Sequence, residues 1–501
     1  MSVRPRLPLA FAVLALAVSW LAVARADIGP ADIYLKAGDL LARDWRYRDA
    51  LALYGQAERV AEGRLRLRAS LGVATSAVRL AEFDLAYAKA IQLRQMHPDD
   101  PQVLAVYGQA AWSVGLFREA EAAFREVLAR NGADVASRLG MARVLAARNR
   151  LSEALDNALA AIAAAPGEAD AYSVAGSIYR RMRRLDEAIP SLTKYYSLLP
   201  ERELDKRTWT QAEIAFLRSF GRRVPGQIDG ASLMAVHRIP IRLVNDKVIV
   251  SARVNGGESV EFVLDTGAEQ TVISDAAARR LGIAAISRTI SAGVGEIGLR
   301  GLQTAQIASL QIGSLTIRNV PCLIKTPPLE GLPVRETESL SPLPLGLSAV
   351  IDYRRKELML GRTLEAEAHE IEMPLWYSRL ATVRGVANTN RPASFIVDTG
   401  GEVVSISLDT ARALSPQPVG RRIPLLVYGT SGWDRDAFLM PGVSLAFEAL
   451  ALKNSSVVVL NLRAPSVLLG YQVGGIVGHH FLSRYRVTFD LERATLGLSA
   501  S

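Results

Sequence analysis

The chain has 501 residues but a single cysteine and few aromatic residues. With Cys322 alone, no disulfide can form within the chain, so packed cores must stabilise the fold. Aromatic residues make up only 6% of the sequence, which leaves Ala, Leu, Val and Ile to build most of the core and favours closely packed helices. Cys322 lies in the apolar run Val320-Pro-Cys-Leu-Ile324, and we expect a small core residue there rather than a nucleophile.

Several common sites for chemistry are also missing. The five histidines form no spaced pair on a helix of the kind that binds zinc. The sequence contains no Gly-x-Ser-x-Gly elbow, no phosphate-binding Gly-Lys-Ser/Thr loop and no dinucleotide-binding fingerprint. We therefore expect neither a metal nor a cofactor.

The charge of the chain is positive but dispersed. Its formal net charge of +9 comes from scattered arginines rather than from a basic block with interleaved aromatic residues. We therefore expect no nucleic-acid partner. Attraction to acidic substrates or to an anionic membrane surface stays open, because net charge affects association more than fold.

The N-terminus has the pattern of an export signal. Arg4 and Arg6 precede an apolar run from Leu7 to Ala24, and Ala24-Arg25-Ala26 fits a small-x-small cleavage site. We expect a signal peptide over residues 1–26, cleaved after Ala26, and a periplasmic or secreted protein. An uncleaved anchor is the alternative, because the run is at the short limit for a membrane span. No later segment is apolar enough to span a bilayer.

A repeat runs from about Ala31 to Pro200. One set of alanines recurs every 34 residues after a first interval of 36, and a second set of small residues precedes each of them by twelve. Small residues at both places let two antiparallel helices approach closely, and prolines at 98, 166 and 200 end units. The first set is Ala50, Ala86, Ala120, Ala154 and Ala188, and the second is Gly38, Ala74, Gly108, Ala142 and Gly176.

This pattern resembles the tetratricopeptide repeat, whose period is 34 residues. The resemblance covers five units and implies an all-α solenoid over residues 27–222, with a capping helix within Glu201–Arg223. Such solenoids bind peptides or proteins, although a pure spacer is the alternative. Beyond Pro225-Gly226, short β-branched runs alternate with Gly and Asn turns, which predicts a β region.

The β region contains two Asp-Thr-Gly triplets. Val260-Glu-Phe-Val-Leu leads into Asp265-Thr-Gly, and Ser394-Phe-Ile-Val leads into Asp398-Thr-Gly. An apolar strand and then a short helix follow each triplet, and a further pair of strands recurs near residues 350–360 and 487–496. A single triplet is a weak signal, but two inside a duplicated unit predict a two-lobed domain.

This duplicated unit resembles the aspartic proteases, specifically the bacterial retropepsin-like branch, over roughly residues 235–499. The resemblance implies lobes at 232–364 and 365–501, with Asp265 and Asp398 as a catalytic pair that shares one proton. It implies that Thr266 and Thr399 bond across the lobes and that Gly267 and Gly400 bring backbone N–H groups toward the carboxyls.

The family also has a hydrophobic-hydrophobic-Gly element beneath each active-site loop. Ile476-Val-Gly478 fits this element in the second lobe, and Leu345-Gly346 is the best candidate in the first. Two glycine-rich stretches are possible flap tips, although each could be a plain hairpin turn. We expect His479 and His480 to be substrate-cleft or surface residues. The possible flap glycines are Gly293, Gly295, Gly429 and Gly432.

The sequence predicts an exported aspartic endopeptidase whose helical repeats recruit a protein substrate or partner. A catalytically silent peptide-binding protein and a repeat-based adaptor are the alternatives. Because both triplets lie in one chain, we expect the site to be complete in a monomer. Ala268 and Gly401 follow the triplets where acid-adapted relatives carry a hydroxyl, so we expect an activity optimum nearer neutral pH.

Overall fold

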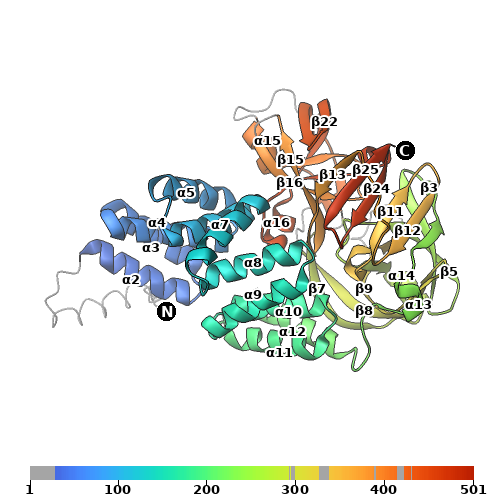
Figure 1. Cartoon of the computed structure of the whole chain (residues 1–501), viewed down its shortest axis with the longest axis horizontal. Helices are drawn as coiled ribbons and strands as arrows, with labels where there is room; N and C mark the ends of the chain where they lie inside the picture. The colour runs from blue at the N-terminus through green and yellow to red at the C-terminus, as the bar shows by residue number, and fades with distance from the viewer. Residues whose placement is uncertain are drawn as a thin grey trace, which may run out of the picture. The chain divides into compact units, whose positions relative to one another are not determined.

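The computed structural model describes residues 29–292, 294, 299–325, 338–388, 391–414, 423–429 and 432–500. The expected signal peptide and the possible flap glycines Gly293 and Gly295 lie outside these residues. Helices form the chain up to about residue 218, and strands dominate the rest (Figure 1). The predicted fold class, a helical repeat region followed by a mainly β region with two similar lobes, is confirmed.

The described helices before residue 200 follow one another as five helix-turn-helix segments. Each turn contains one residue with positive φ, at the same place in the repeat: Trp45, Ala81, Gly115, Asn149 and Arg183. This left-handed residue ends the first helix and reverses the chain. The segments are α2 (Pro30–Arg43) and α3 (Tyr47–Val60), α4 (Gly63–Arg79) and α5 (Phe83–Met96), α6 (Pro101–Ser113) and α7 (Phe117–Arg130), α8 (Val135–Ala147) and α9 (Leu151–Ala164), and α10 (Ala169–Arg181) and α11 (Leu185–Leu198).

The recurring small residues are explained by aromatic rings between the helices. A Cβ atom on Gly108 would lie 2.5 Å from the ring of Phe124, and one on Gly140 would lie 2.3 Å from it. Phe124 on α7 therefore packs against both its own α6 and the following α8. The five recurring alanines are fully buried, so the 34-residue register of the sequence marks the helix contacts.

The chain divides into two compact units, Met1–Ser76 and Ala77–Ser501. The first unit has a small core of its own, and the second contains the later repeats together with the whole β region. The core of the first unit consists of Leu35, Ala50, Tyr54, Ala57, Ala69 and Val73.

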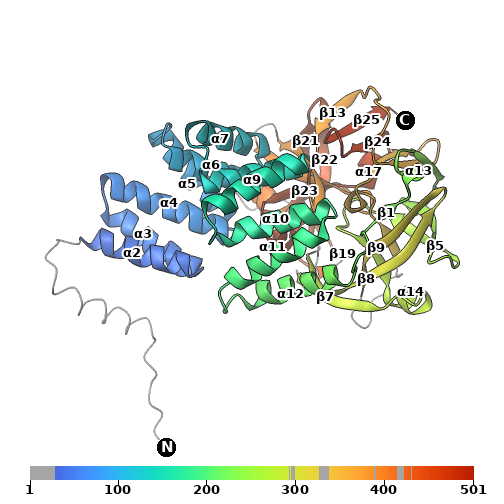
Figure 2. The ribbon, with the colours of Figure 1, turned by 60° about the horizontal axis from the view of Figure 1, so that its bottom comes forward.

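The predicted capping helix is α12 (Leu204–Arg218), which buries Ile214, Phe216 and Leu217. It packs against α11 and also against the strand β7 (Ala285–Ala292), beside which it lies in Figure 2. Just beyond the helix, Gln306 donates a hydrogen bond to the Ser219 hydroxyl at 2.6 Å. Therefore α12 links the solenoid to the first lobe.

The first lobe is built on a nine-stranded sheet, and its strands alternate buried and exposed residues as in a half-buried sheet. Its elements are β1 (Gln227–Ile228), α13 (Gly230–Leu233), β2 (His237–Pro240), β3 (Arg242–Val244), β4 (Lys247–Val254), β5 (Ser259–Leu264), β6 (Thr271–Ser274), α14 (Asp275–Arg280), β7, β8 (Leu299–Ile312), β9 (Leu315–Lys325), β10 (Glu338–Leu340), the 3-10 helix η1 (Leu343–Leu345), β11 (Ser348–Asp352) and β12 (Glu357–Gly361).

The second lobe is built on an eight-stranded sheet. Its elements are β13 (Ile371–Pro374), β14 (Trp376–Ser378), β15 (Leu380–Ala387), β16 (Arg391–Val397), β17 (Ser405–Ser407), α15 (Leu408–Leu414), β18 (Ile423–Pro424), β19 (Val427–Gly429), β20 (Gly432–Asp434), β21 (Phe438–Phe447), β22 (Leu450–Leu460), α16 (Arg463–Leu469), β23 (Val473–Val477), α17 (His479–Leu482), β24 (Tyr485–Asp490) and β25 (Thr495–Ala500).

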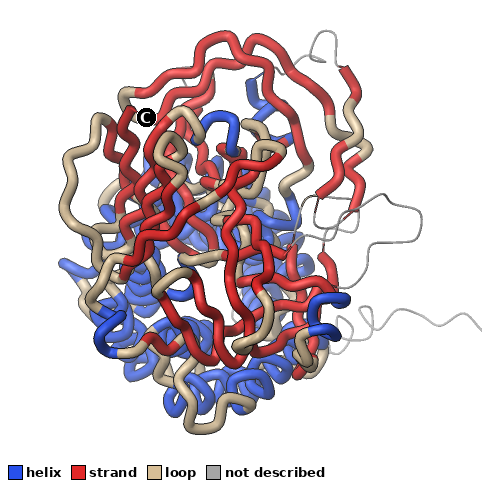
Figure 3. The backbone as a smooth tube through the Cα atoms, turned by 90° about the vertical axis from the view of Figure 1, so that its right-hand side faces the viewer, coloured by secondary structure: helices blue, strands red, loops and turns tan. Residues whose placement is uncertain are grey.

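The two lobes share one connectivity, which confirms the duplication seen in the sequence. The strand that ends at each triplet runs parallel to a later strand: β5 pairs with β10, and β16 pairs with β23. The strand after each triplet is also matched, because β6 runs parallel to β9 and β17 runs parallel to β22. A six-stranded sheet in the order β13-β25-β24-β11-β12-β2 joins the lobes, and Figure 3 marks the strands of the β region in red.

Within the second unit, the turns between paired helices pack against the second lobe. Phe117 at the start of α7 contacts the rings of Trp376 and Tyr471, with centroid distances of 5.0 Å in both cases. The Gln472 N–H donates to the Ser113 carbonyl at 2.7 Å. One continuous hydrophobic core therefore includes residues of both the repeats and the second lobe.

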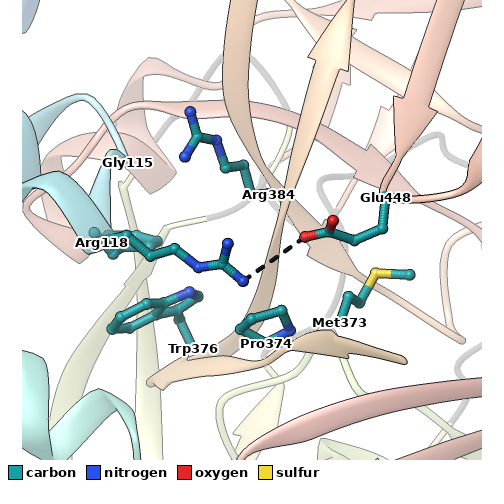
Figure 4. A pocket seen from close by; sticks show the side chains of 8 residues that line it. Gly115, Arg118, Met373, Pro374, Trp376, Arg384 and Glu448 are labelled. Atoms are coloured by element: carbon teal, nitrogen blue, oxygen red, sulfur yellow. Dashed lines mark ion pairs between the residues drawn. The ribbon is translucent and has the colours of Figure 1, made fainter. Parts of the chain in front are cut away.

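A small pocket lined by both charged and apolar side chains lies beside this contact (Figure 4). Arg118 faces Glu448 across it at 3.8 Å, with Trp376 below. Arg384, which also lines the pocket, forms an ion pair with Glu119 at 2.9 Å. None of the residues that line the pocket belongs to either triplet.

Candidate active site

Both triplets lie directly after a buried strand. Asp265 follows β5 and Asp398 follows β16. The Asp265 N–H donates to the Leu340 carbonyl at 2.9 Å, and the Asp398 N–H donates to the Val477 carbonyl at 3.0 Å. Each aspartate is thus held at the end of the parallel strand pair of its own lobe.

The two threonines link the triplet loops reciprocally. The Thr266 hydroxyl donates to the Val397 carbonyl at 2.7 Å, and the Thr399 hydroxyl donates to the Leu264 carbonyl at 2.8 Å. Each hydroxyl also accepts the backbone N–H of the other threonine at 3.1 Å. Both side chains are buried, so water cannot compete for these four hydrogen bonds, and the bonds fix the two loops against each other.

The two glycines bring the carboxyls together. A Cβ atom on Gly267 would lie 2.4 Å from the Asp398 carboxyl carbon, and one on Gly400 would lie 2.6 Å from the Asp265 carboxyl carbon. The Gly267 N–H donates to Asp265 at 3.0 Å, and the Gly400 N–H donates to Asp398 at 2.8 Å. Each glycine therefore orients its own aspartate and makes room for the opposite one.

The environment of the pair favours a bound proton. Burial, then the charge of Asp398 and a hydrogen bond with it, raise the pKa of Asp265 to about 8, although the Gly267 N–H and Lys247 act in the opposite direction. Two buried carboxyls that are hydrogen-bonded to each other cannot both ionise without a large cost in free energy. The proton belongs to the pair rather than to either side chain.

Two ion pairs between the lobes brace these loops, and sequence reasoning missed them. Lys247 at the start of β4 lies 3.5 Å from Glu402 and donates to the Gly400 carbonyl at 2.5 Å. In the mirrored position, Arg379 donates to Glu269 at 2.8 Å. In both lobes a glutamate follows the triplet at the same position, and a basic residue precedes the triplet by a similar distance. This repeated sequence pattern could have identified the two ion pairs.

The element beneath the second-lobe loop lies where the sequence placed it. Ile476 and Val477 are in β23, and a Cβ atom on Gly478 would lie 2.5 Å from the Val403 carbonyl oxygen. The first-lobe assignment to Leu345-Gly346 is wrong. Leu340, at the end of β10, accepts the Asp265 N–H, which makes Ser341 the counterpart of Gly478.

Gly346 has another role: it ends η1 with a φ of 71°. Because the first-lobe element carries Ser341 instead of a glycine, the family pattern was not recognisable there. The parallel register of Glu338, Ser339 and Leu340 with β5 identifies the element only in three dimensions.

The strands that flank the two possible flap stretches come from hairpins that approach each other. In the first lobe, β7 and β8 pair antiparallel, and Val294 between them is described. In the second lobe, β19 and β20 pair with Gly429 opposite Gly432. A Cβ atom on Gly429 would lie 2.2 Å from the Val294 carbonyl oxygen, so these two hairpins touch.

The remaining reactive side chains are packed or paired. His479 lies in α17 and is buried against Tyr353, not in a cleft or at the surface as expected, whereas exposed His480 lies 3.3 Å from Asp246. Cys322 is fully buried in β9, and burial raises the pKa of its thiol to about 12. Among the described residues, no group of three or more His, Cys, Asp or Glu could hold a metal ion.

Two stretches of the β region match known families. Residues 250–332 match the gag-polyprotein putative aspartyl protease model, and residues 381–481 match the aspartyl protease model. Each match contains one triplet. The predicted resemblance to aspartyl proteases and to tetratricopeptide-repeat proteins is confirmed. No curated protein matches the chain.

Solved tetratricopeptide-repeat structures are similar to part of the chain. TTC0263, a thermophilic TPR protein of Thermus thermophilus, has 22% identity, and the match covers 36% of this chain and 97% of that one with a TM-score of 0.31. YrrB, a TPR protein with an unusual peptide-binding site, has 22% identity over 34% of this chain and 87% of that one, with a TM-score of 0.23.

Proposed function

We propose that the chain is an aspartic endopeptidase, in which Asp265 and Asp398 activate water to hydrolyse peptide bonds of a protein substrate. The observation that carries this proposal is the reciprocal geometry of the triplets, in which each glycine leaves room for the carboxyl of the opposite lobe. A protease that activates water with carboxyl groups alone needs such a pair, because one carboxylate must take a proton from water while a carboxylic acid donates one to the substrate carbonyl.

The surroundings of the pair suit this division of work. Backbone N–H groups bind Oδ1 of each aspartate, which fixes the direction of the other oxygen. The raised pKa of Asp265 keeps one proton on the pair near neutral pH. We assign the acid and the base to the pair as a whole.

Replacing either aspartate tests the proposal. In purified full-length protein, Asp265→Asn and Asp398→Asn should each lower the cleavage rate of an unstructured polypeptide by about 10³-fold, because an amide cannot share the proton. Asp409→Asn, in the first turn of α15, is the matched control and should cleave at the wild-type rate.

Two rival functions would give a different outcome. A peptide-binding protein without catalysis, or a repeat-based adaptor, would leave the wild type as inert as the two asparagine variants from pH 3 to pH 8. Such a result would refute the protease proposal. Binding of the same polypeptide by the inert protein would then favour the peptide-binding alternative.

The repeats and the N-terminus complete the proposal. The solenoid would recruit a protein substrate or partner, as tetratricopeptide repeats commonly present a peptide-binding surface. Export to the periplasm with cleavage after Ala26 is supported by the Arg4, Arg6 and apolar-run pattern. No described helix is both long and apolar enough to cross a membrane. Sequencing the N-terminus of protein from the producing cell would test for a start at Asp27.

A further inference from the structure

The fifth repeat presents a cluster of arginines to both lobes. The end of α10 and the turn to α11 read Arg180-Arg-Met-Arg-Arg184. Arg184 is exposed and pairs with Glu187 of its own helix, as surface charges commonly do. Arg181 and Arg183 are directed into the protein instead, and their contacts lie near the supports of the two triplets.

Arg181 binds the edge strand of the second lobe. Its guanidinium donates to the Ala146 carbonyl at 2.7 Å, to Asn149 at 3.1 Å and to the Tyr377 carbonyl at 3.3 Å, and it lies 5.1 Å from the centre of the Tyr377 ring. A guanidinium is well suited to this place, because its fork serves several fixed acceptors at once.

The strand that Arg181 binds leads directly to the active-site loops. Tyr377 is the middle residue of β14, and Arg379, just after this strand, forms the ion pair with Glu269 behind the first triplet. Two other repeats hold the same strand, because Phe117 and Arg148 both contact the ring of Trp376. Three successive repeats therefore fix β14.

Arg183 binds the first lobe. It donates to the Leu345 carbonyl at 2.6 Å, and a Cβ atom on Gly346 or Gly226 would lie within 3.6 Å of its guanidinium. Leu345 ends η1, the turn that follows the strand whose Leu340 carbonyl holds the Asp265 N–H. Burial lowers the pKa of Arg183 to about 10, which reflects how much water its guanidinium has lost.

We propose that Arg181 and Arg183 are positioning residues, through which the fifth repeat holds β14 and η1 and so aligns the two triplet loops. The solenoid is then part of the framework of the active site as well as a surface for partners. Burying a guanidinium is costly unless it is hydrogen-bonded, and here each guanidinium has one acceptor in a supporting segment: the Tyr377 carbonyl of β14 for Arg181 and the Leu345 carbonyl of η1 for Arg183. This inference rests on the proposed protease function for its kinetic readout.

The test compares alanine variants of the full chain. Arg181→Ala and Arg183→Ala should each lower kcat by about tenfold or more while KM changes by less than about twofold, because misaligned loops impair chemistry more than binding. Arg184→Ala is the matched control and should keep both values. Amide exchange at Asp265 should become faster in the two variants and stay unchanged in the control.

Lysine variants separate positioning from general stability. Arg183→Lys can still donate to the single Leu345 carbonyl and should restore kcat. Arg181→Lys should not, because Arg181 bonds its three acceptors from two separate nitrogens and a lysine has only one. If an alanine variant does not fold, the two lysine variants provide the test instead. The proposal is overturned if the Arg181 and Arg183 variants match Arg184→Ala, or if exchange rises uniformly over both lobes.

The exchange measurement keeps this inference separate from the protease proposal. A wild-type chain without proteolysis would refute the protease function, but faster exchange confined to Asp265 and the segments around β14 and η1 would still support positioning. Conversely, an active wild type with unaffected arginine variants would refute positioning alone.

Discussion

At the residue scale, Gly267 and Gly400 decide how closely the two aspartates approach. Each glycine lies where any side chain would collide with the carboxyl of the opposite lobe. Neither residue has the positive φ that favours glycine in a tight turn. Glycine is therefore required at these positions for the space it leaves, and not for its backbone conformation.

We predict that Gly267→Ala and Gly400→Ala each lower the cleavage rate by about 10²-fold or more, because the added methyl group must push the carboxyls apart. Gly167→Ala is the control, since a Cβ atom there would meet nothing within 4 Å. Circular dichroism and kcat measured side by side would check this prediction. Full activity in either active-site variant would contradict the observed geometry.

The pKa of Asp265 gives a pH prediction at the same scale. Since the folded protein binds a proton with a pKa of about 8, cleavage should persist near pH 7 and fall as pH rises through about 8, when the pair loses its proton. An activity maximum below about pH 3 would contradict this prediction.

The same shift has a defined effect on stability. The folded pKa of Asp265 is raised, so its contribution to stability is present below the ordinary aspartate pKa and is lost as pH rises toward 8. Asp265→Asn should therefore gain melting temperature relative to wild type over that window, by about 1 °C per kcal/mol relieved in a chain of this size. Glu258→Gln, an exposed residue of the same lobe, should show no such trend.

At the element scale, the two lobes use one plan with different residues. In each lobe, the strand that leads into the triplet pairs with a later parallel strand, β10 in the first lobe and β23 in the second. The residue after this later strand is Ser341 in the first lobe and Gly478 in the second. Only the second lobe brings a backbone carbonyl, that of Val403, so close that a side chain is excluded.

We predict that Gly478→Ala lowers both the melting temperature and the cleavage rate, the latter by about 10²-fold, because the methyl group would displace the loop that carries Val403. Ser341→Ala is the matched control, since that position already accommodates a Cβ atom. Thermal melts and kcat would check the pair. Equal tolerance at both positions would mean that the lobes do not differ as described.

At the scale of the whole molecule, one chain provides both halves of the site. The six-stranded sheet joins the lobes, and the threonine bonds close the dyad within the chain. The later repeats share a hydrophobic core with the second lobe, so these repeats and this lobe are packed together.

We predict that the specific activity does not change when the protein is diluted, because no second copy is needed to complete the dyad. Cleavage rates measured over a wide range of enzyme concentration, alongside sedimentation of the same samples, would check this prediction. A specific activity that falls steeply on dilution, together with dissociation of a dimer, would contradict it.

The sequence by itself determined the helical repeats, the duplicated β unit and the residues of the two triplets. These features are local: a 34-residue period follows from helix length, and each triplet lies in a short apolar strand that repeats. The tertiary structure decided the rest. Ser341 was recognisable as the counterpart of Gly478 only from strand pairing, and Lys247 and Arg379 pair with glutamates of the opposite lobe.

The contacts of Arg181 and Arg183 with Tyr377 and Leu345 join residues more than 150 positions apart in the chain. No local pattern records such contacts, because they depend on how the lobes and repeats pack after each has formed. For the same reason Leu345-Gly346 seemed to belong beneath the active-site loop, when it ends the turn that receives Arg183. Spacing along the chain predicts elements, whereas packing decides which elements support the site.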